Sequence, residues 1–203
     1  MSSRPVVVGV TGASGAVYAQ RLVEELLARE HEVLLAVSSA GRLVVKEELA
    51  CAPREDPWGQ TNRHLLHVFS AKDFGAPFCS GSFRFHGMVI IPASMSTVGA
   101  VASGYTANCI HRGADVALKE GRKLVVVPRE TPFSTVHLEN LLSLARAGAV
   151  ILPPSPAFYQ RPASVDDIVD FVVSRVLDAL HVDNELYPRW KENLQAGGRG
   201  EDP

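Results

Sequence analysis

A short apolar run, KLVVV at residues 123–127, constrains the fold of this chain most strongly. Its apolar residues follow one another without alternation, which is typical of a strand that is buried on both faces. Helical patterns separate it from similar runs, which are Val6–Val10, His31–Val37, Leu65–Phe69, Met88–Ile91 and Ala149–Leu152. Strands of this kind form parallel sheets that helices cover on both sides. We therefore predict a Rossmann-like three-layer α/β/α fold with a mostly parallel sheet.

The length of the chain fits one such domain. The chain has 203 residues, of which 46% are hydrophobic and 21% are charged, as is ordinary for a globular protein with a substantial core. The last helical pattern covers residues 165–180, and the sequence after it becomes polar and rich in glycine. We predict a single domain over residues 1–181 and a tail over residues 182–203, with its last residues disordered.

Charge and cysteine content narrow the classes of function. Lys and Arg number 20 and Asp and Glu number 22, so the net charge is 20 − 22 = −2, which argues against nucleic-acid binding through a broad basic surface. No apolar run approaches the length of a membrane span, about 20 residues, and the N-terminus lacks the layout of a signal peptide. The three cysteines have neither metal-ligand nor disulfide spacing. We predict a reduced cytoplasmic protein without a metal site or a membrane partner.

A glycine-rich turn, TGASGA, follows the first apolar run. Gly12 and Gly15 allow the backbone to approach a ligand closely, and Thr11 and Ser14 supply hydroxyls. A helix is predicted from Ala16, and unpaired N–H groups at a helix start favour an anion. The glycine spacing departs from the full dinucleotide fingerprint, and no clear ribose-binding acid ends the second strand. The turn therefore favours a mononucleotide over NAD.

Polar side chains also follow the other strands. Ser38 ends the second strand, Ser94 and Thr97 follow the run at residues 88–91, and Arg129 and Glu130 follow the run at residues 123–127. In open α/β sheets, ligands bind outside the carboxyl ends of the strands, so these side chains predict a ligand site there. Two simpler interpretations stay open. Ser38 can cap the next helix, and the charged pair can belong to a surface turn.

Seven segments, in this order and spacing, resemble the flavin prenyltransferase family of UbiX type. They are VTGASGAVYAQRL, SGS, IPASMST, RGADVALKE, VVVPRETPFSTVHLENLL, FYQRP and LYPRW, and the match that they make spans nearly the whole chain. The resemblance implies an enzyme that joins a dimethylallyl group from dimethylallyl monophosphate to reduced FMN without a metal. Its product, prenylated FMN, serves partner decarboxylases of UbiD type. Members form dodecamers with active sites where subunits meet.

The same resemblance implies roles for residues at the prenyl donor. Lys119, Arg129, Arg175 and Tyr159 match the positions that bind its phosphate. These fixed cations and the hydroxyl would stabilise the departing phosphate in place of a metal. Glu130 matches an acid that acts near the same phosphate.

On the flavin side, the resemblance implies a second set of residues. Ser14 matches the hydroxyl near the reactive N5 edge of the ring, and Glu48 matches a carboxylate that helps proton movement. Trp190 belongs instead with the substrate-binding residues: it matches a tail aromatic near the site, although packing of the tail explains it almost as well. The FMN phosphate and the adjoining backbone contacts are assigned to Gly12, Ala13, Ser38, Ser94, Thr97 and Arg112.

Two further expectations concern packing. The helical segment at residues 98–104 is rich in small residues, and Phe83 and Phe85 are apolar, so we expect both regions to meet a neighbouring subunit. Cys109 is expected to be a packed core thiol without a catalytic role. It follows Ala107 and Asn108, where family members often carry an acidic residue before the Asn.

Two rival functions stay open. One is a related flavoprotein that decarboxylates peptidyl cysteines, although its peptide-cysteine clamp is missing from the sequence. The other is an FMN-binding companion subunit of a decarboxylase, which would not need Lys119, Arg129, Glu130 and Tyr159 together.

Overall fold

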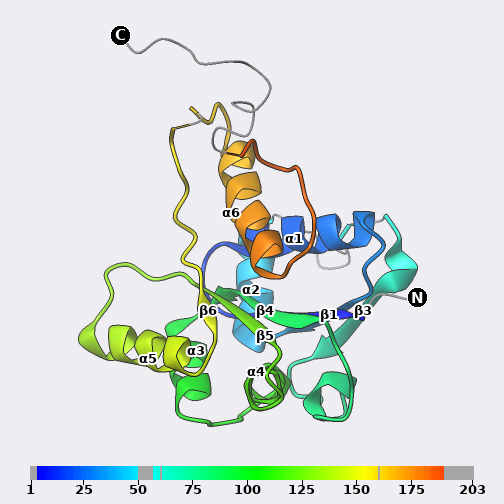
Figure 1. The fold of residues 1–203 in the computed structure, drawn as a ribbon, viewed down its shortest axis with the longest axis vertical. Coiled ribbons are helices and arrows are strands. Elements are labelled where there is room, and N and C mark those ends of the chain that lie inside the picture. The colour runs from blue at the N-terminus through cyan, green and yellow to red at the C-terminus, as the bar shows by residue number, and fades with distance from the viewer. Residues whose placement is uncertain (1–3, 50–56, 60, 160, 190–203) are drawn as a thin grey trace, which may run out of the picture.

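The computed structural model describes residues 4–49, 57–59, 61–159 and 161–189, which are built around a six-stranded sheet (Figure 1). Every strand pairing is parallel, and the strand order is β3-β2-β1-β4-β5-β6. The strands are β1 (Val6–Val10), β2 (Val33–Val37), β3 (Leu66–Ser70), β4 (Gly87–Ala93), β5 (Lys123–Pro128) and β6 (Val150–Ile151). The predicted Rossmann-like architecture is confirmed.

Helices cover both faces of the sheet and form the two outer layers (Figure 1). They are α1 (Ala16–Ala28), α2 (Ser39–Glu48), α3 (Met95–Ala102), α4 (Cys109–Lys119), α5 (Thr135–Arg146) and α6 (Val165–Ala179), with short 3-10 turns η1 (Arg63–Leu65) and η2 (Pro77–Cys79). Side chains of α1, α2 and α6 form one core with the sheet, and those of α3, α4 and α5 form a second core. These two cores make the three layers.

Burial explains why the apolar runs form this sheet. All five residues of β1 and of β2 are buried, because each strand has helices on both faces. β3 lies at the edge, where Leu66 is buried and His67 and Val68 are exposed. The longer continuous runs therefore become inner strands, the more mixed run becomes one edge, and the short β6 forms the other edge.

The chain reverses its direction of strand addition between β1 and β4. β2 and β3 lie on one side of β1, whereas β4, β5 and β6 lie on the other. This is the topological switch point, where loops from the carboxyl ends of two neighbouring strands diverge and leave a crevice for a ligand. The glycine-rich turn after β1 and the loop Ala93–Ser94 after β4 flank this point.

One packing expectation is wrong, because Phe85 is buried within its own chain. Phe85 is only 1% exposed and lies beneath the Arg122 guanidinium of its own chain, 4.4 Å from the ring centroid. Gly99 of α3 packs against α5 of the same chain, since a Cβ added there would lie 3.3 Å from the Asn140 side chain. The expectation that the rest of the segment at residues 98–104 meets a neighbouring subunit stays a prediction. Close approach is therefore used within the subunit, where Phe85 and α3 complete the second core.

Helix α5 has more apolar residues than it buries in the core. The sequence is amphipathic over this helix, and Leu141 and Leu144 are buried. Leu138 and Leu142 are 53% and 48% exposed, and Val136 is 62% exposed. Leu138 and Leu142, one helical turn apart, form an outward apolar patch on α5. Within the described ranges, none of the helices is long and apolar enough to cross a membrane.

Candidate functional site

The glycine-rich turn is fixed to the end of β4 by Thr11. The Thr11 hydroxyl donates to the Pro92 carbonyl at 2.7 Å and accepts from the Ser94 backbone N–H at 2.7 Å. Thr11 is 2% exposed, so its hydroxyl serves the frame and is not presented to a ligand. It joins the two loops of the switch point. Gly12 is needed because a Cβ there would lie 2.4 Å from the Cβ of Ala40 at the start of α2.

Glu48 occupies the start of α1. Its carboxylate accepts from the Gly15 N–H at 2.8 Å and from the Ala16 N–H at 2.7 Å. Burial alone would raise the pKa of Glu48, but hydrogen bonds from Ser14, Gly15 and Ala16, with Arg129 nearby, lower it below the usual carboxyl value. Glu48 is therefore ionised at neutral pH, where it can accept a proton but has none to donate. The anion site expected at this helix start is filled by the chain's own carboxylate.

The hydroxyls after β2 and β4 cap the next helices. Ser38 Oγ accepts from the Gly41 N–H at 2.9 Å, and Ser94 Oγ accepts from the Thr97 N–H at 3.4 Å. Ser94 also donates to the Thr97 hydroxyl at 3.2 Å. A serine that accepts as a helix cap still has an O–H to donate. Capping and ligand binding are therefore compatible at Ser38.

Arg129 and Glu130 follow β5 at the same carboxyl edge. The Arg129 backbone N–H donates to the Ala93 carbonyl at 3.2 Å, and its guanidinium Nε donates to the Ser14 carbonyl at 3.2 Å. Glu130 accepts from the backbone N–H of Thr131 at 3.0 Å. Arg129 thus lies against the same glycine-rich turn whose N–H groups bind Glu48.

The carboxyl edge has the donors that a phosphate-bearing mononucleotide requires. Helices α2 and α3 both begin here with a serine cap, so their positive ends point toward the crevice. Arg129 adds a full positive charge next to the backbone of the glycine-rich turn. Hydroxyls, helix starts and one guanidinium form a donor set that suits a phosphate.

Arg112 and Lys119 lie in a different place, beside the loop that follows η2. Arg112 donates through Nε to the Cys79 carbonyl at 3.1 Å and pairs with Asp115. Lys119 pairs with Glu120 at 2.5 Å, and a Cβ on Gly81 would lie 2.8 Å from its Nζ. The contacts described for Arg112 thus include neither Ser38 nor Thr97, the two residues with which it was predicted to bind one phosphate.

Arg122 holds this loop in shape. Its two terminal nitrogens donate to the carbonyls of Phe83 and Gly81, each at 2.6 Å, and its guanidinium stacks on Phe85. The sequence reading missed this role, because a lone Arg after a helix carries no local signal for loop contacts 39 and 41 residues away. Arg122 therefore fixes the loop that lies beside Lys119.

Tyr159 and Arg175 form a third group. They line a cavity of about 250 Å³ between α6 and the segment after it. Arg175 pairs with Asp178 at 2.8 Å. Arg189, which the sequence reading did not single out, pairs with the same carboxylate at 3.0 Å. Only the segment LYPRW, quoted for the resemblance, pointed to this position.

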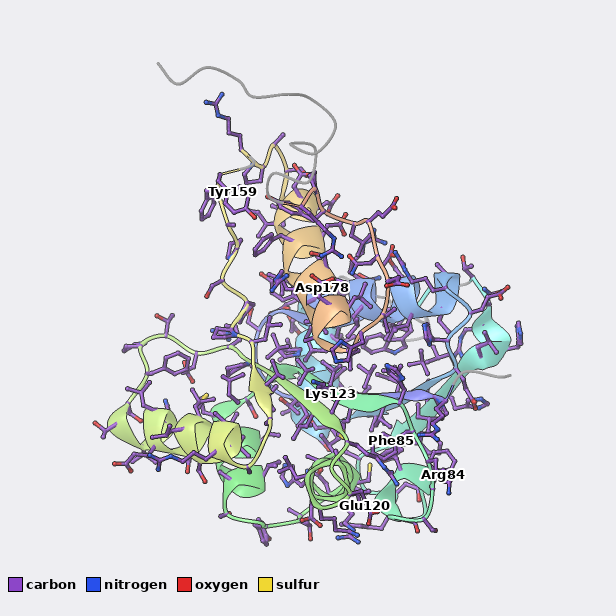
Figure 2. The ribbon with its side chains drawn as sticks, in the orientation of Figure 1. Arg84, Phe85, Glu120, Lys123, Tyr159 and Asp178 are labelled. Carbon is purple, nitrogen blue, oxygen red and sulfur yellow. The ribbon has the colours of Figure 1, made fainter. Side chains whose placement is uncertain are left out.

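Within one chain, three groups of predicted site residues lie apart: those at the carboxyl edge of the sheet, Arg112 with Lys119, and Tyr159 with Arg175. Lys119 precedes the start of β5 and Arg129 follows its end, so the length of that strand, roughly 20 Å, separates their backbones. Figure 2 shows Tyr159 and Asp178 on the α6 side of the sheet, with Glu120, the neighbour of Lys119, on the opposite side. Trp190 lies outside the described residues.

Cys109 is a packed core thiol, as expected. It is fully buried, and burial raises its pKa to about 12. The thiol is therefore protonated and unreactive at neutral pH. Among the residues that the structure describes, no group of three or more His, Cys, Asp or Glu side chains could hold a metal ion.

Comparison with known proteins places this geometry in a family. The family model described as Flavoprotein matches residues 1–177. The protein is 46% identical to flavin prenyltransferase UbiX of Methanocaldococcus jannaschii, and the match covers 91% of this chain and 97% of the relative. It is 45% identical to flavin prenyltransferase UbiX of Pseudomonas aeruginosa, with 92% and 94% covered.

Solved structures agree with these relatives. A crystal structure of AnUbiX in complex with FMN and dimethylallyl pyrophosphate superposes with a TM-score of 0.86 at 41% identity, covering 93% of this chain and 98% of that one. A dodecameric, FMN-dependent UbiX-like decarboxylase of Escherichia coli O157:H7 superposes with a TM-score of 0.83 at 42% identity, covering 92% and 98%. The peptidyl-cysteine decarboxylase EpiD shares 14% identity, which shows the fold alone. This chain belongs to the flavin prenyltransferase family of UbiX type.

Proposed function

We propose that this protein is a flavin prenyltransferase that transfers a dimethylallyl group from dimethylallyl monophosphate to reduced FMN. The observation that carries the proposal is the match of more than nine-tenths of the chain to flavin prenyltransferases at 45–46% identity. The AnUbiX structure, with FMN and dimethylallyl pyrophosphate bound, has the same fold. In the reaction, the allylic carbon–oxygen bond of the donor breaks, the prenyl carbon bonds to the flavin, and phosphate leaves.

FMN belongs at the switch point, where the donor set fits its phosphate. Ser38 and Thr97 supply hydroxyls there, and the starts of α2 and α3 supply backbone N–H groups. When bound, reduced FMN supplies the ring positions that accept the prenyl group. Ser14 and the ionised Glu48 lie together beside the glycine-rich turn, where Glu48 can accept a proton.

The donor phosphate must be stabilised as the carbon–oxygen bond breaks. Lys119, Arg175 and Tyr159 are the groups that we assign to this task. Preorganised cations and hydroxyls at a developing charge commonly provide the largest single contribution to catalysis. Arg175 and Tyr159 line one cavity, but Lys119 lies across the sheet from it in the same chain. A complete donor site therefore requires a second subunit.

The proposed assembly is a homo-oligomer with shared active sites. The relative from Escherichia coli O157:H7 is described as dodecameric. In this chain, Leu138 and Leu142 of α5 lie one helical turn apart and are about half exposed, and such an apolar patch is stabilised by burial against another subunit. A cytoplasmic location and a UbiD-type decarboxylase that receives the prenylated flavin complete the proposal.

Within one chain, Arg129 and not Arg112 lies beside the proposed flavin site, so we assign Arg129 to the flavin of its own subunit. Arg129→Ala is expected to lower FMN retention, because its guanidinium lies against the Ser14 carbonyl, whereas Arg112→Ala is expected to keep the flavin. Flavin absorbance of each purified variant measures this. Retention by Arg129→Ala together with loss by Arg112→Ala would restore the assignment that the sequence alone suggested.

The rival functions differ in what they release. The reduced, FMN-loaded protein is given either dimethylallyl monophosphate or a peptide with a C-terminal cysteine. Phosphate release with the first compound and no decarboxylation of the second supports the prenyltransferase. Decarboxylation of the peptide would support the rival enzyme, and the absence of both products would support a flavin-carrying companion subunit.

A further inference from the structure

The cavity beside α6 contains one more cation than the family resemblance assigned to it. The lining includes Tyr159 and Arg175, and also Asp178, Tyr187 and Arg189. Arg189 comes from the segment after α6, which folds back along that helix. Its side chain is 47% exposed, and that of Arg175 is 56% exposed. Two guanidinium groups therefore share one open cavity.

Asp178 holds both arginines. It accepts from Arg175 at 2.8 Å and from the two terminal nitrogens of Arg189 at 3.0 and 3.3 Å. Asn184 donates to the same carboxylate at 3.0 Å, and its carbonyl accepts from Arg189 at 3.4 Å. Because Arg189 donates to Asp178 through two nitrogens, the orientation of its guanidinium plane is fixed as well as its position.

The charge of this cluster suits an anion. One carboxylate and two guanidinium groups leave a net charge of +1 in a cavity that Tyr159 also lines. Tyr187 lies close to Tyr159, and the Tyr187 hydroxyl is buried and has no hydrogen-bond partner in the described structure. A phosphate that enters the cavity would meet a positive charge and the Tyr159 side chain.

We propose that Arg189 binds the phosphate of the prenyl donor together with Arg175 and Tyr159, and that Asp178 is the positioning residue for both arginines. This inference rests on the proposed function, because that function places the donor phosphate in this cavity. A shared carboxylate allows two like charges to lie close together, since it offsets their mutual repulsion. It also presents them side by side, as a phosphate with several oxygens requires.

A purely structural role is the alternative. The contacts of Arg189 with Asp178 and Asn184 also fasten the segment after α6 to that helix. In that case, replacing Arg189 lowers stability but leaves the affinity for phosphate unchanged. Affinity and stability must therefore be measured separately.

The test is calorimetric binding of dimethylallyl monophosphate to the FMN-loaded protein at two salt concentrations, with inorganic phosphate as a second probe. Arg189→Gln is expected to raise the Kd of both probes about tenfold, as for the loss of one charge-assisted hydrogen bond. The salt dependence of binding should become weaker, because one cation has been removed. Flavin content should not change, and KM for the donor should rise more than kcat falls.

Two variants make the comparison specific. Arg4→Gln removes an exposed arginine next to the start of β1, at the opposite edge of the sheet from the carboxyl ends, and should leave both Kd values unchanged. Asp178→Asn makes the cavity more positive, so charge alone predicts tighter binding. The positioning role predicts weaker binding, and tighter binding would overturn it.

Failure of this inference can be distinguished from failure of the proposed function. If Arg175→Gln loses about tenfold in affinity and Arg189→Gln stays within about twofold of the wild type, only the role of Arg189 is overturned. If neither variant changes the Kd, the cavity is not the donor site, and the functional assignment of Tyr159 and Arg175 falls as well. Arg189→Lys keeps the charge but loses the planar pair of donors, so its Kd should lie between those of the wild type and of Arg189→Gln.

Discussion

Lys119→Ala is expected to transfer the prenyl group about a hundredfold more slowly than the wild type, because losing one fixed donor to a departing charge commonly costs about 3 kcal/mol. The variant should keep its FMN, since Lys119 lies at the far end of β5 from the glycine-rich turn. Single-turnover prenylation of reduced FMN, followed by mass spectrometry, measures the rate, and absorbance measures the flavin. Lys123→Ala, at the same edge of the sheet, is the matched control (Figure 2).

This prediction extends to mixed oligomers. If Lys119 serves a site that contains Glu130 of another subunit, refolding Lys119→Ala together with Glu130→Gln at equal amounts creates some intact sites. Random assembly then restores about a quarter of the wild-type activity, because each of the two required residues is intact in half of the chains. No recovery in the mixture would mean that both residues act from the same chain. In that case, the separation seen here would not describe the active enzyme.

Glu130→Gln is expected to bind both FMN and dimethylallyl monophosphate and yet turn over at least about a hundredfold more slowly, the usual minimum for a lost general acid or base. The substitution keeps the shape of the side chain and its hydrogen bond from Thr131, but it removes the group that exchanges a proton. Single-turnover kinetics give the rate, and calorimetry gives the two affinities.

The control for Glu130→Gln is Glu139→Gln, the same change on the exposed surface of α5, which should have wild-type kinetics. A Glu130→Gln variant with normal turnover would exclude proton transfer by this residue. Loss of donor affinity with an unchanged rate at saturation would instead identify Glu130 as a binding group.

Local patterns explain why most of the fold could be predicted. The run at residues 6–10 forms β1, and the run at residues 123–127 forms β5 together with Pro128. Both runs form inner strands because consecutive apolar side chains are stable in a strand only when both of its faces are covered. The strand ends then had to gather at one edge of a parallel sheet, so Ser38, Ser94 and Arg129 could be placed near one another.

The unpredicted parts depend on contacts between distant residues. The pattern of the glycine-rich turn favours an anion at the start of α1, but only the folded chain shows that Glu48, about 33 residues away, fills that place. The role of Thr11 as a link to Pro92 has the same origin, since a hydroxyl next to glycines looks equally suited to a ligand.

The separation of Lys119 from Arg129 did have a signal in the sequence. A residue before a strand and a residue after it lie at opposite edges of the sheet, and Lys119 and Arg129 flank β5 in this way. The resemblance matched both residues to one phosphate, so the sequence itself contained a conflict. Assigning Arg129 to the flavin and Lys119 to a donor site shared with a second subunit resolves it. Leu138 and Leu142 of α5 do not pack into the core of their own chain, and their exposure is a second indication of a neighbouring subunit.

The most direct measurement is the mass of the flavin that the protein releases after its FMN is reduced and dimethylallyl monophosphate is added under anaerobic conditions. A prenyltransferase releases a flavin that is heavier than FMN by one added prenyl group, and it releases one phosphate for each flavin modified. Recovery of unmodified FMN from a protein that binds both compounds would contradict the account.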